Sequence, residues 1–287
     1  MTKAELNAGG ISNNAITKDL KKRLVRLAAK YETSDFLKSD PSQFLYYYKN
    51  PADIELCAFT ASLLSFGNRK QFIPKIQFVM QQADLSGGIF TWIKNRDFEK
   101  TFSPDNNKKF YRFYSYKDFY ILFSLLSQIL QTDETFGIFL NSKYNDLLNN
   151  NGTLTNFTDC SKIPSAKNAG SVNLADIISE YFANCKIVPS TKTSAKKRLC
   201  MFLRWMVRDG SPVDIGLWTW YPKKDLLIPL DVHVLQEAQK LNIISEKETA
   251  TRKTAQKLTD FAKQIFPEDP AKLDFALFGI GVDSKSN

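Results

Sequence analysis

Residues 53–67 read DIELCAFTASLLSFG and predict a helix that is apolar on nearly all of its sides. Such a helix is buried on most faces, so we expect it at the centre of the fold. Asp53 is the predicted N-cap, and Gly67 is the predicted glycine that ends the helix. The polar turn expected at the mouth of this buried helix consists of Asn68, Arg69, Lys70 and Gln71.

Outward from this stretch, apolar residues recur at helical spacing, and neither a convincing strand pair nor an internal repeat is found. The predicted helices span about residues 19–31, 72–83, 116–131, 134–148, 172–184, 195–208, 232–242, 246–266 and 270–278. Residues 148–171 are rich in turn formers and predict a loop. The fold class is therefore expected to be all-α, with residues 1–18 as a flexible tail and residues 19–287 as a single domain.

Two helix boundaries carry specific capping signals. Ser245 and Glu248 have the spacing of a capping box, which is expected to start the helix at about residues 246–266. Asp269 followed by Pro270 predicts the start of the last helix. Gly279 is expected to end that last helix.

The composition narrows the classes of partner and cofactor. A formal net charge of +9 and a pI of about 9.2 favour a polyanionic partner, although a basic chain can also simply be a soluble one. The four cysteines match no zinc or iron–sulfur spacing, and a single histidine argues against a histidine metal site, so no metal or cofactor is expected. With no signal peptide or membrane span in the sequence, we expect a cytoplasmic monomer.

The stretch VPSTKTSAKKRLCMFLRWMVRDG, residues 188–210, is the most informative for chemistry. Ser194 is the predicted N-cap of its helix, and Lys197, Arg204 and Arg208 are expected to form one basic stripe. Lys197 lies in the first turn, where the helix dipole and its cationic neighbours disfavour an ammonium group. A neutral amine is a candidate nucleophile. The alternative is a solvated basic face that contacts phosphate or nothing.

Two aspartates are candidate partners for this lysine. Asp231 in LLIPLDVHVLQEAQKLNI opens a predicted helix, and its simplest role is that of an N-cap, which does not preclude catalysis. Asp274 in DPAKLDFALFGIG lies within an otherwise apolar helix, so its carboxylate needs a hydrogen-bond partner or a ligand. A salt bridge to a neighbouring element is the alternative for Asp274. His233 is expected to be a packed or surface residue.

Together these stretches resemble a bacterial family, the domain-of-unknown-function 2400 proteins. The segments that carry the resemblance are DPSQFLYYY, DIELCAFTASLLSFGNRKQ, FYRF, KKRLCMFLRWMVR, DIGLW, LIPLDVHV and DFALFGIG. That family in turn resembles the helix–hairpin–helix DNA glycosylases, most closely the archaeal 8-oxoguanine enzymes. This resemblance implies two helical lobes around a central cleft, with Lys197 as the catalytic lysine and Asp231 as the catalytic aspartate.

The resemblance also implies a DNA partner and further roles. The residues expected to line the pocket for the extruded base are Ser65, Asp274 and Phe278. The residues expected to contact DNA are Asn68, Arg69, Lys70, Gln71, Lys192, Ser194, Arg204 and Arg208. The Gly-x-Gly of the usual hairpin is absent here, so Lys192 and nearby hydroxyls are expected to replace its phosphate grip.

The function implied is base excision from damaged DNA, with 8-oxoguanine as one candidate lesion, by base flipping and attack of Lys197 on C1′. Strand cleavage by β-elimination would follow. Two alternatives stay open. One is a non-catalytic nucleic-acid-binding module of the same fold, and the other is a helical protein-interaction domain.

Overall fold

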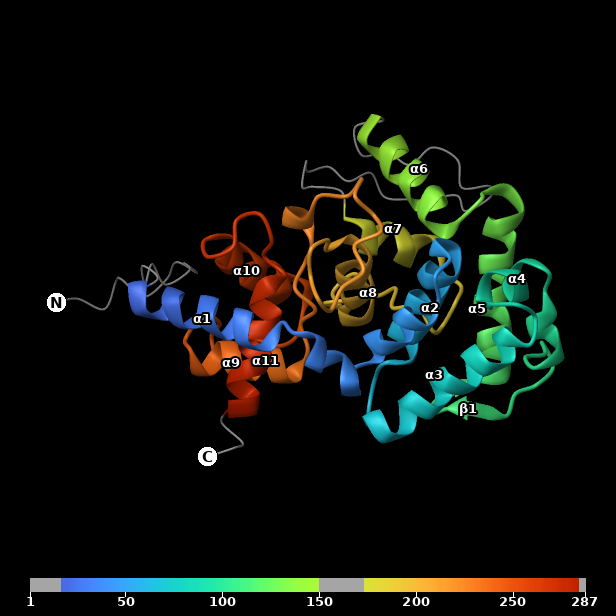
Figure 1. The fold of residues 1–287 in the computed structure, drawn as a ribbon, viewed down its shortest axis with the longest axis horizontal. Helices are drawn as coiled ribbons and strands as arrows, with labels where there is room; N and C mark the ends of the chain where they lie inside the picture. The colour runs from blue at the N-terminus through green and yellow to red at the C-terminus, as the bar shows by residue number, and fades with distance from the viewer. Residues whose placement is uncertain (1–16, 150–172, 284–287) are drawn as a thin grey trace, which may run out of the picture.

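The computed structural model describes residues 17–149 and 173–283, which are mostly helical (Figure 1). The α-helices are α1 (Lys18–Tyr31), α2 (Pro51–Leu64), α3 (Arg69–Asp84), α4 (Ile89–Lys94), α5 (Tyr116–Thr132), α6 (Phe136–Asn149), α7 (Leu174–Tyr181), α8 (Lys197–Val207), α9 (Val232–Lys240), α10 (Arg252–Lys263) and α11 (Lys272–Asp283). Short 3-10 helices lie at Ser34–Ser39, Pro41–Tyr47, Asp97–Lys100 and Lys223–Asp225. The all-α prediction is confirmed.

One small hairpin interrupts the helices. Strands β1 (Lys109–Tyr111) and β2 (Tyr114–Ser115) pair antiparallel. Neither strand was predicted from the sequence, because each is too short to show an alternating pattern. Helix α4, which spans fewer than two helical turns, was not predicted either.

Helix α2 is buried along nearly its whole length, as the apolar stretch predicted. Its N-cap is Asn50 rather than Asp53, because the Asn50 side chain accepts a hydrogen bond from the Ala52 amide at 3.0 Å. Asp53 lies one turn further on and is buried. Its carboxylate accepts a hydrogen bond from the Phe90 amide at 2.8 Å, which joins α2 to the start of α4.

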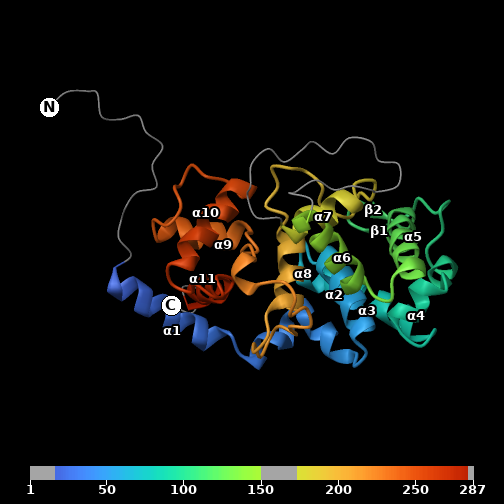
Figure 2. The ribbon, with the colours of Figure 1, turned by 90° about the horizontal axis from the view of Figure 1, so that it is seen from above.

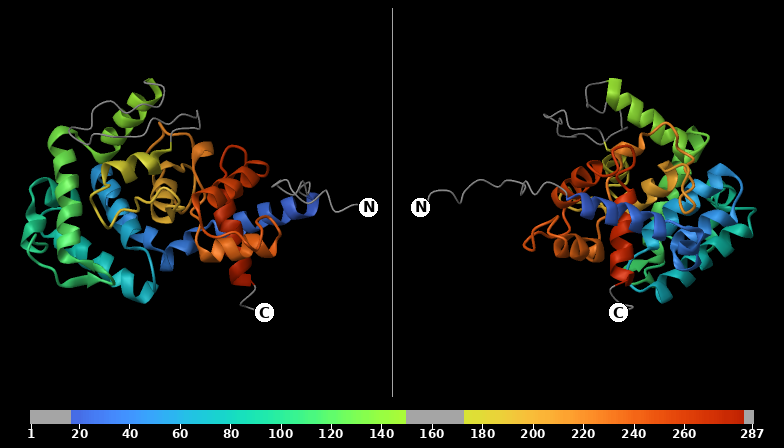
Figure 3. Two further views of the ribbon diagram at one scale, coloured as in Figure 1. Left: turned by 180° about the vertical axis from the view of Figure 1, so that it is seen from behind. Right: turned by 60° about the vertical axis from the view of Figure 1, so that its left-hand side comes forward.

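The buried apolar side chains form two separate clusters. The larger surrounds α2 and includes residues of α3 to α8. The smaller is built from α1, α9, α10 and α11, together with residues such as Ala195 and Ile228. The same division is visible in Figure 1, where α1 and α9 to α11 lie at one end of the molecule, and in the views of Figures 2 and 3.

Several predicted boundaries are wrong. Helix α10 begins after the N-cap Thr251, because the Glu248 carboxylate binds Lys257 instead of closing a capping box with Ser245. Helix α11 continues through Gly279, where the missing side chain lets Tyr31 of α1 pack closely. Lys18 belongs to α1 rather than to a tail, and the Thr17 side chain caps that helix.

Other predictions fall partly on residues that the structure does not describe. Residues 1–16 of the predicted tail lie outside the described ranges, as do residues 150–171 of the predicted loop. None of the helices formed by the described residues is long and apolar enough to span a bilayer.

Candidate active site

Lys197 and Asp231, which are 34 positions apart in the chain (231 − 197), meet at the boundary between the two clusters. The Lys197 Nζ lies 3.5 Å from Asp231 Oδ2. Lys197 is the first residue of α8, and Asp231 is the N-cap of α9. The two side chains are 34% and 33% exposed, so solvent or a ligand can reach both.

The orientation of Lys197 follows from the conformation of the residues before it. Lys196 adopts a left-handed conformation with φ +49°, and its amide donates to Ser194 Oγ at 3.1 Å. The predicted N-cap at Ser194 is therefore wrong, since Lys196 occupies the cap position. The Lys196 side chain is buried and binds Asp176 at 2.7 Å, which leaves Lys197 to face Asp231.

The segment before α8 is also attached to α10. Ser194 and Thr251 form an isolated antiparallel bridge. The amide of Arg252 donates to the Thr193 carbonyl at 2.9 Å, and the Arg252 guanidinium contacts Asp176 at 3.1 Å. These contacts fix the position at which α8 begins, and with it the position of Lys197.

Asp274 lies in α11 and is electrostatically coupled to the same pair. Its carboxylate binds the buried guanidinium of Arg204. The pKa of Asp274 is raised to about 6, chiefly by burial; the Arg204 and Lys197 charges lower it and the Asp231 charge raises it, and all of these effects are included in that value. Asp274 therefore changes its charge closer to neutral pH than an exposed aspartate does.

The expectation that Arg204 and Arg208 contact DNA is corrected by their burial. Arg204 binds Asp214 and Asp274, and Arg208 binds Glu32, Asp214 and Asp269. The two side chains are 4% and 1% exposed. The basic stripe expected on α8 is therefore limited to its first turn, because the two arginines neutralise buried carboxylates instead.

Phe278 and Ser65 differ in their access to solvent. Phe278 is 36% exposed, and its ring packs edge-on against Tyr31 and Phe36 at 6.0 and 5.0 Å between centroids. Ser65 follows α2 and is buried, with its hydroxyl donating to the Ala61 carbonyl at 2.7 Å. Ser65 already uses its donor inside the protein, whereas part of the Phe278 ring is available for contact.

The turn after α2 is exposed, as its polar sequence predicted. Asn68 is the N-cap of α3, and its side chain accepts from the Lys70 amide at 2.9 Å. Arg69 lies 3.7 Å from Asp40. Lys70 and Gln71 are exposed in the first turn of α3, so their side chains are free to reach solvent or a ligand.

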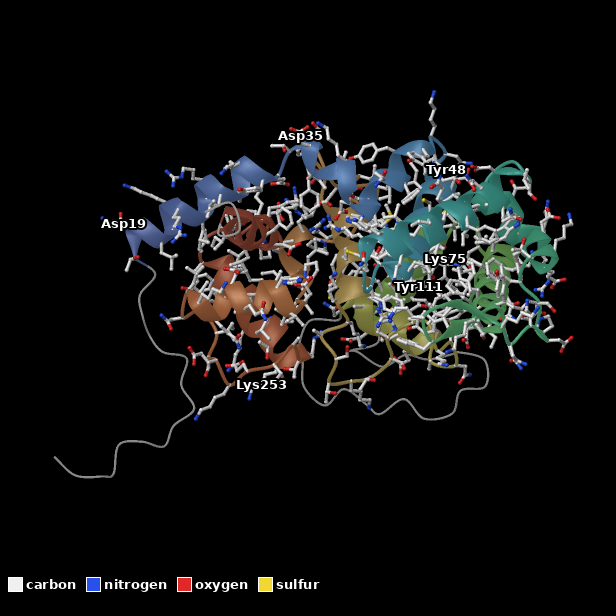
Figure 4. All side chains as sticks on the ribbon, turned by 90° about the horizontal axis from the view of Figure 1, so that it is seen from below. Asp19, Asp35, Tyr48, Lys75, Tyr111 and Lys253 are labelled. Atoms are coloured by element: carbon white, nitrogen blue, oxygen red, sulfur yellow. The ribbon has the colours of Figure 1, made fainter. Side chains whose placement is uncertain are left out.

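Lys192 lines a hollow of about 630 Å³ at the start of α10. Four cationic side chains share this wall, namely Lys192, Arg252, Lys253 and Lys257. Among the described residues, no carboxylate lines the hollow, although Arg252 and Lys257 each bind one beside it. Figure 4 shows Lys253 at the outer edge of the molecule.

The three α10 cations of this hollow were not predicted from the sequence. The spacing of Arg252, Lys253 and Lys257 along the helix is typical of any solvent-exposed helix face, so it does not indicate a binding site. The hollow exists because the Thr193 and Thr251 segments are bridged. That contact joins residues nearly sixty positions apart, which no local pattern reveals.

Metal-binding and thiol chemistry find little support in the described residues. There, no group of three or more His, Cys, Asp and Glu side chains is arranged to hold a metal ion. Cys57, Cys185 and Cys200 are free and buried. Burial raises the pKa of Cys185 to about 11 and that of Cys200 to about 12, so both remain thiols at neutral pH.

Comparison with known proteins places the chain in a family but supplies no activity. No curated protein and no solved structure matches it. A family model described as "Protein of unknown function (DUF2400)" matches residues 40–283, which include Lys197, Asp231 and Asp274. The chain belongs to this family, DUF2400.

Proposed function

We propose that this protein is a DNA glycosylase of the helix–hairpin–helix type that removes a damaged base and uses Lys197 as its nucleophile. The observation that carries the proposal is the pair formed by Lys197 and Asp231, 3.5 Å apart and both accessible. A lysine beside a fixed carboxylate, each about one-third exposed, matches the needs of covalent attack on a sugar carbon.

In the proposed reaction, Asp231 first accepts a proton from the Lys197 ammonium. The neutral amine then donates its lone pair to C1′ as the bond between C1′ and the base nitrogen breaks. The base leaves with the electron pair of the broken C1′–N bond and takes up a proton. The alkylated lysine nitrogen loses a proton, and its lone pair then forms the iminium as the C1′–O4′ bond breaks and O4′ takes up a proton. Loss of a C2′ proton expels the 3′ phosphate.

The charge distribution supports a nucleic-acid substrate. The net charge of +9 favours a polyanion, and the hollow at α10 is lined by four cations next to the Ser194–Thr251 bridge. Cations at such a surface hold the backbone of a distorted duplex while one nucleotide is extruded. Asp274 and the exposed part of Phe278 are the proposed contacts to the extruded base.

Borohydride trapping tests the proposal. The full chain is incubated with duplexes that each hold one damaged base, 8-oxoguanine among them, and the covalent adduct is measured after reduction. We expect an adduct with the wild type and none with Lys197→Ala. Lys223→Ala is the matched control, because Lys223 is also 34% exposed and also binds an aspartate, Asp209, at 2.5 Å.

Two outcomes contradict the proposal. An adduct that survives Lys197→Ala removes this residue from the nucleophile role. The absence of both an adduct and base release across the lesions, combined with salt-dependent DNA binding, indicates a binding module without catalysis.

A further inference from the structure

The tip of the β1–β2 hairpin carries an exposed aromatic ring on a firm support. Phe113 is 55% exposed, whereas its neighbours Tyr111 and Tyr114 are 4% and 2% exposed. Arg112 adopts a left-handed conformation with φ +50°, which turns the chain between the two strands. The ring is therefore held outward by a short turn whose two flanking tyrosines are anchored in the core.

The hairpin is braced against the end of α2. The Tyr111 hydroxyl donates to the Phe66 carbonyl, and the Phe113 ring lies 5.4 Å from the Phe66 ring between centroids. Gly67 approaches the Arg112 guanidinium so closely that a side chain at Gly67 would overlap it. The tip thus lies directly beside the exposed turn that follows α2.

Arg198 connects this tip to the candidate active site. Its guanidinium donates to the Tyr114 hydroxyl at 3.1 Å and to the Leu63 carbonyl at 2.6 Å. Arg198 directly follows Lys197 in α8. Phe113 in turn directly precedes Tyr114. The proposed nucleophile and the exposed ring are therefore each the chain neighbour of a residue in the Arg198–Tyr114 contact, at the first turn of α8.

The surroundings of Phe113 are positively charged. The Lys186 ammonium donates to the Phe113 carbonyl at 3.4 Å, and Lys75 lies 4.8 Å from the centre of the Phe110 ring in β1. None of the ion pairs formed among the described residues includes Arg112 or Lys186. Figure 4, seen from below, labels Lys75 and Tyr111.

We infer that the Arg112–Phe113 tip is a nucleic-acid contact in which the Phe113 ring stacks on a base and Arg112 binds a backbone phosphate. An exposed ring among uncompensated cations fits stacked bases linked by phosphates, since every base offers a π face and every linkage a negative charge. The inference rests on the proposed function for its DNA partner. Beyond that proposed function, it assigns to the Phe113 ring the gap that an extruded base leaves in the duplex.

The test measures binding separately from chemistry. The full chain is titrated by fluorescence anisotropy with an intact duplex and with a duplex that holds a tetrahydrofuran abasic site opposite 2-aminopurine. We expect Phe113→Ala to weaken binding to the abasic duplex at least about five-fold, as loss of one stacked base does, and to reduce the change in 2-aminopurine fluorescence. Phe113→Trp is expected to retain both signals. Tyr47→Ala is the matched control, because Tyr47 is an exposed ring, 64% accessible, on a 3-10 helix distant in sequence.

The outcomes separate this inference from the proposed function. Binding by Phe113→Ala equal to that of the wild type overturns the inference, and so does a wild type that binds neither duplex. Weakened binding by Phe113→Ala in a protein that forms no borohydride adduct supports the hairpin contact and contradicts the glycosylase proposal alone.

Discussion

The two carboxylate oxygens of Asp231 serve different partners, and one of these partners is Lys197. Oδ1 accepts the Val234 amide at 2.9 Å and so caps α9, while Oδ2 lies 3.5 Å from the Lys197 Nζ. A residue required only for structure would need the first contact alone. The two roles can be separated because asparagine caps a helix nearly as well as aspartate but carries no charge.

Asp231→Asn and Asp231→Ala are expected to differ in stability but not in their loss of function. The alanine variant loses the cap and should lower the free energy of unfolding by about 1 kcal/mol, whereas the asparagine variant should stay near the wild type in this respect. Both variants should form the borohydride adduct far more slowly, since neither accepts a proton from Lys197. Urea unfolding and adduct formation are the two measurements. Full adduct formation by Asp231→Asn would leave this residue with a capping role only.

Arg208→Met is expected to destabilise the fold rather than to weaken DNA binding selectively. Arg208 is 1% exposed and binds Glu32, Asp214 and Asp269, so its removal leaves three carboxylates with less compensation. Breaking a buried ion pair from one side costs about 3–5 kcal/mol. Urea unfolding measures the loss, and Arg23→Met on the exposed side of α1 is the control. A stable Arg208→Met variant with weakened DNA binding would instead support the direct contact between Arg208 and DNA that was expected from the sequence.

The sequence was sufficient to predict the helical class and the central position of α2, because both depend on local apolar spacing. It was not sufficient for the environment of Arg204 and Arg208. Their spacing from Lys197 on one helix suggested a shared surface. The four carboxylates that pair with these buried arginines all lie outside α8. The two that are furthest from α8 in sequence are Glu32 and Asp274. Long-range partners of this kind leave no periodic signal.

The pairing of Lys197 with Asp231 could be predicted from the sequence only through the resemblance to the DNA glycosylases. Asp231 alone predicts an N-cap, and that prediction is confirmed. The proximity of Lys197 to Asp231 depends on the left-handed conformation of Lys196 and on the bridge between Ser194 and Thr251. Neither feature follows from propensity, since lysine seldom adopts a positive φ.

Asp274→Asn should change the pH dependence of stability in a defined direction. Burial raises the pKa of Asp274 from a usual value near 3.8 to about 6. Between these values the folded protein holds a proton that the unfolded chain has released, so the free energy of unfolding of the wild type falls as the pH rises. The asparagine variant lacks this change. The wild type should therefore lose up to about 3 kcal/mol relative to the variant between about pH 4 and pH 7.

Urea unfolding at a series of pH values measures this difference. Asp35→Asn is an informative control, because the exposed Lys38 lowers the pKa of Asp35. The wild type should then gain rather than lose stability relative to that variant as the pH rises through the range below about pH 4. A gap between the wild type and Asp274→Asn that stays constant with pH would show that the carboxylate is already ionised near pH 4.

Gly279→Ala is expected to separate α1 from α11. Both Gly279 and Gly281 lie within α11, where alanine is favoured over glycine by up to about 1 kcal/mol. A methyl group at Gly279 would overlap the Tyr31 ring, whereas one at Gly281 would come no closer than 3.8 Å to Glu237. Overpacking of this kind costs about 1–3 kcal/mol, so Gly279→Ala should be less stable than the wild type while Gly281→Ala is equal or more stable. Thermal unfolding of the two variants checks the contrast. Equal stability of both would mean that Tyr31 turns aside without cost, and that the packing of α1 on α11 does not depend on this glycine.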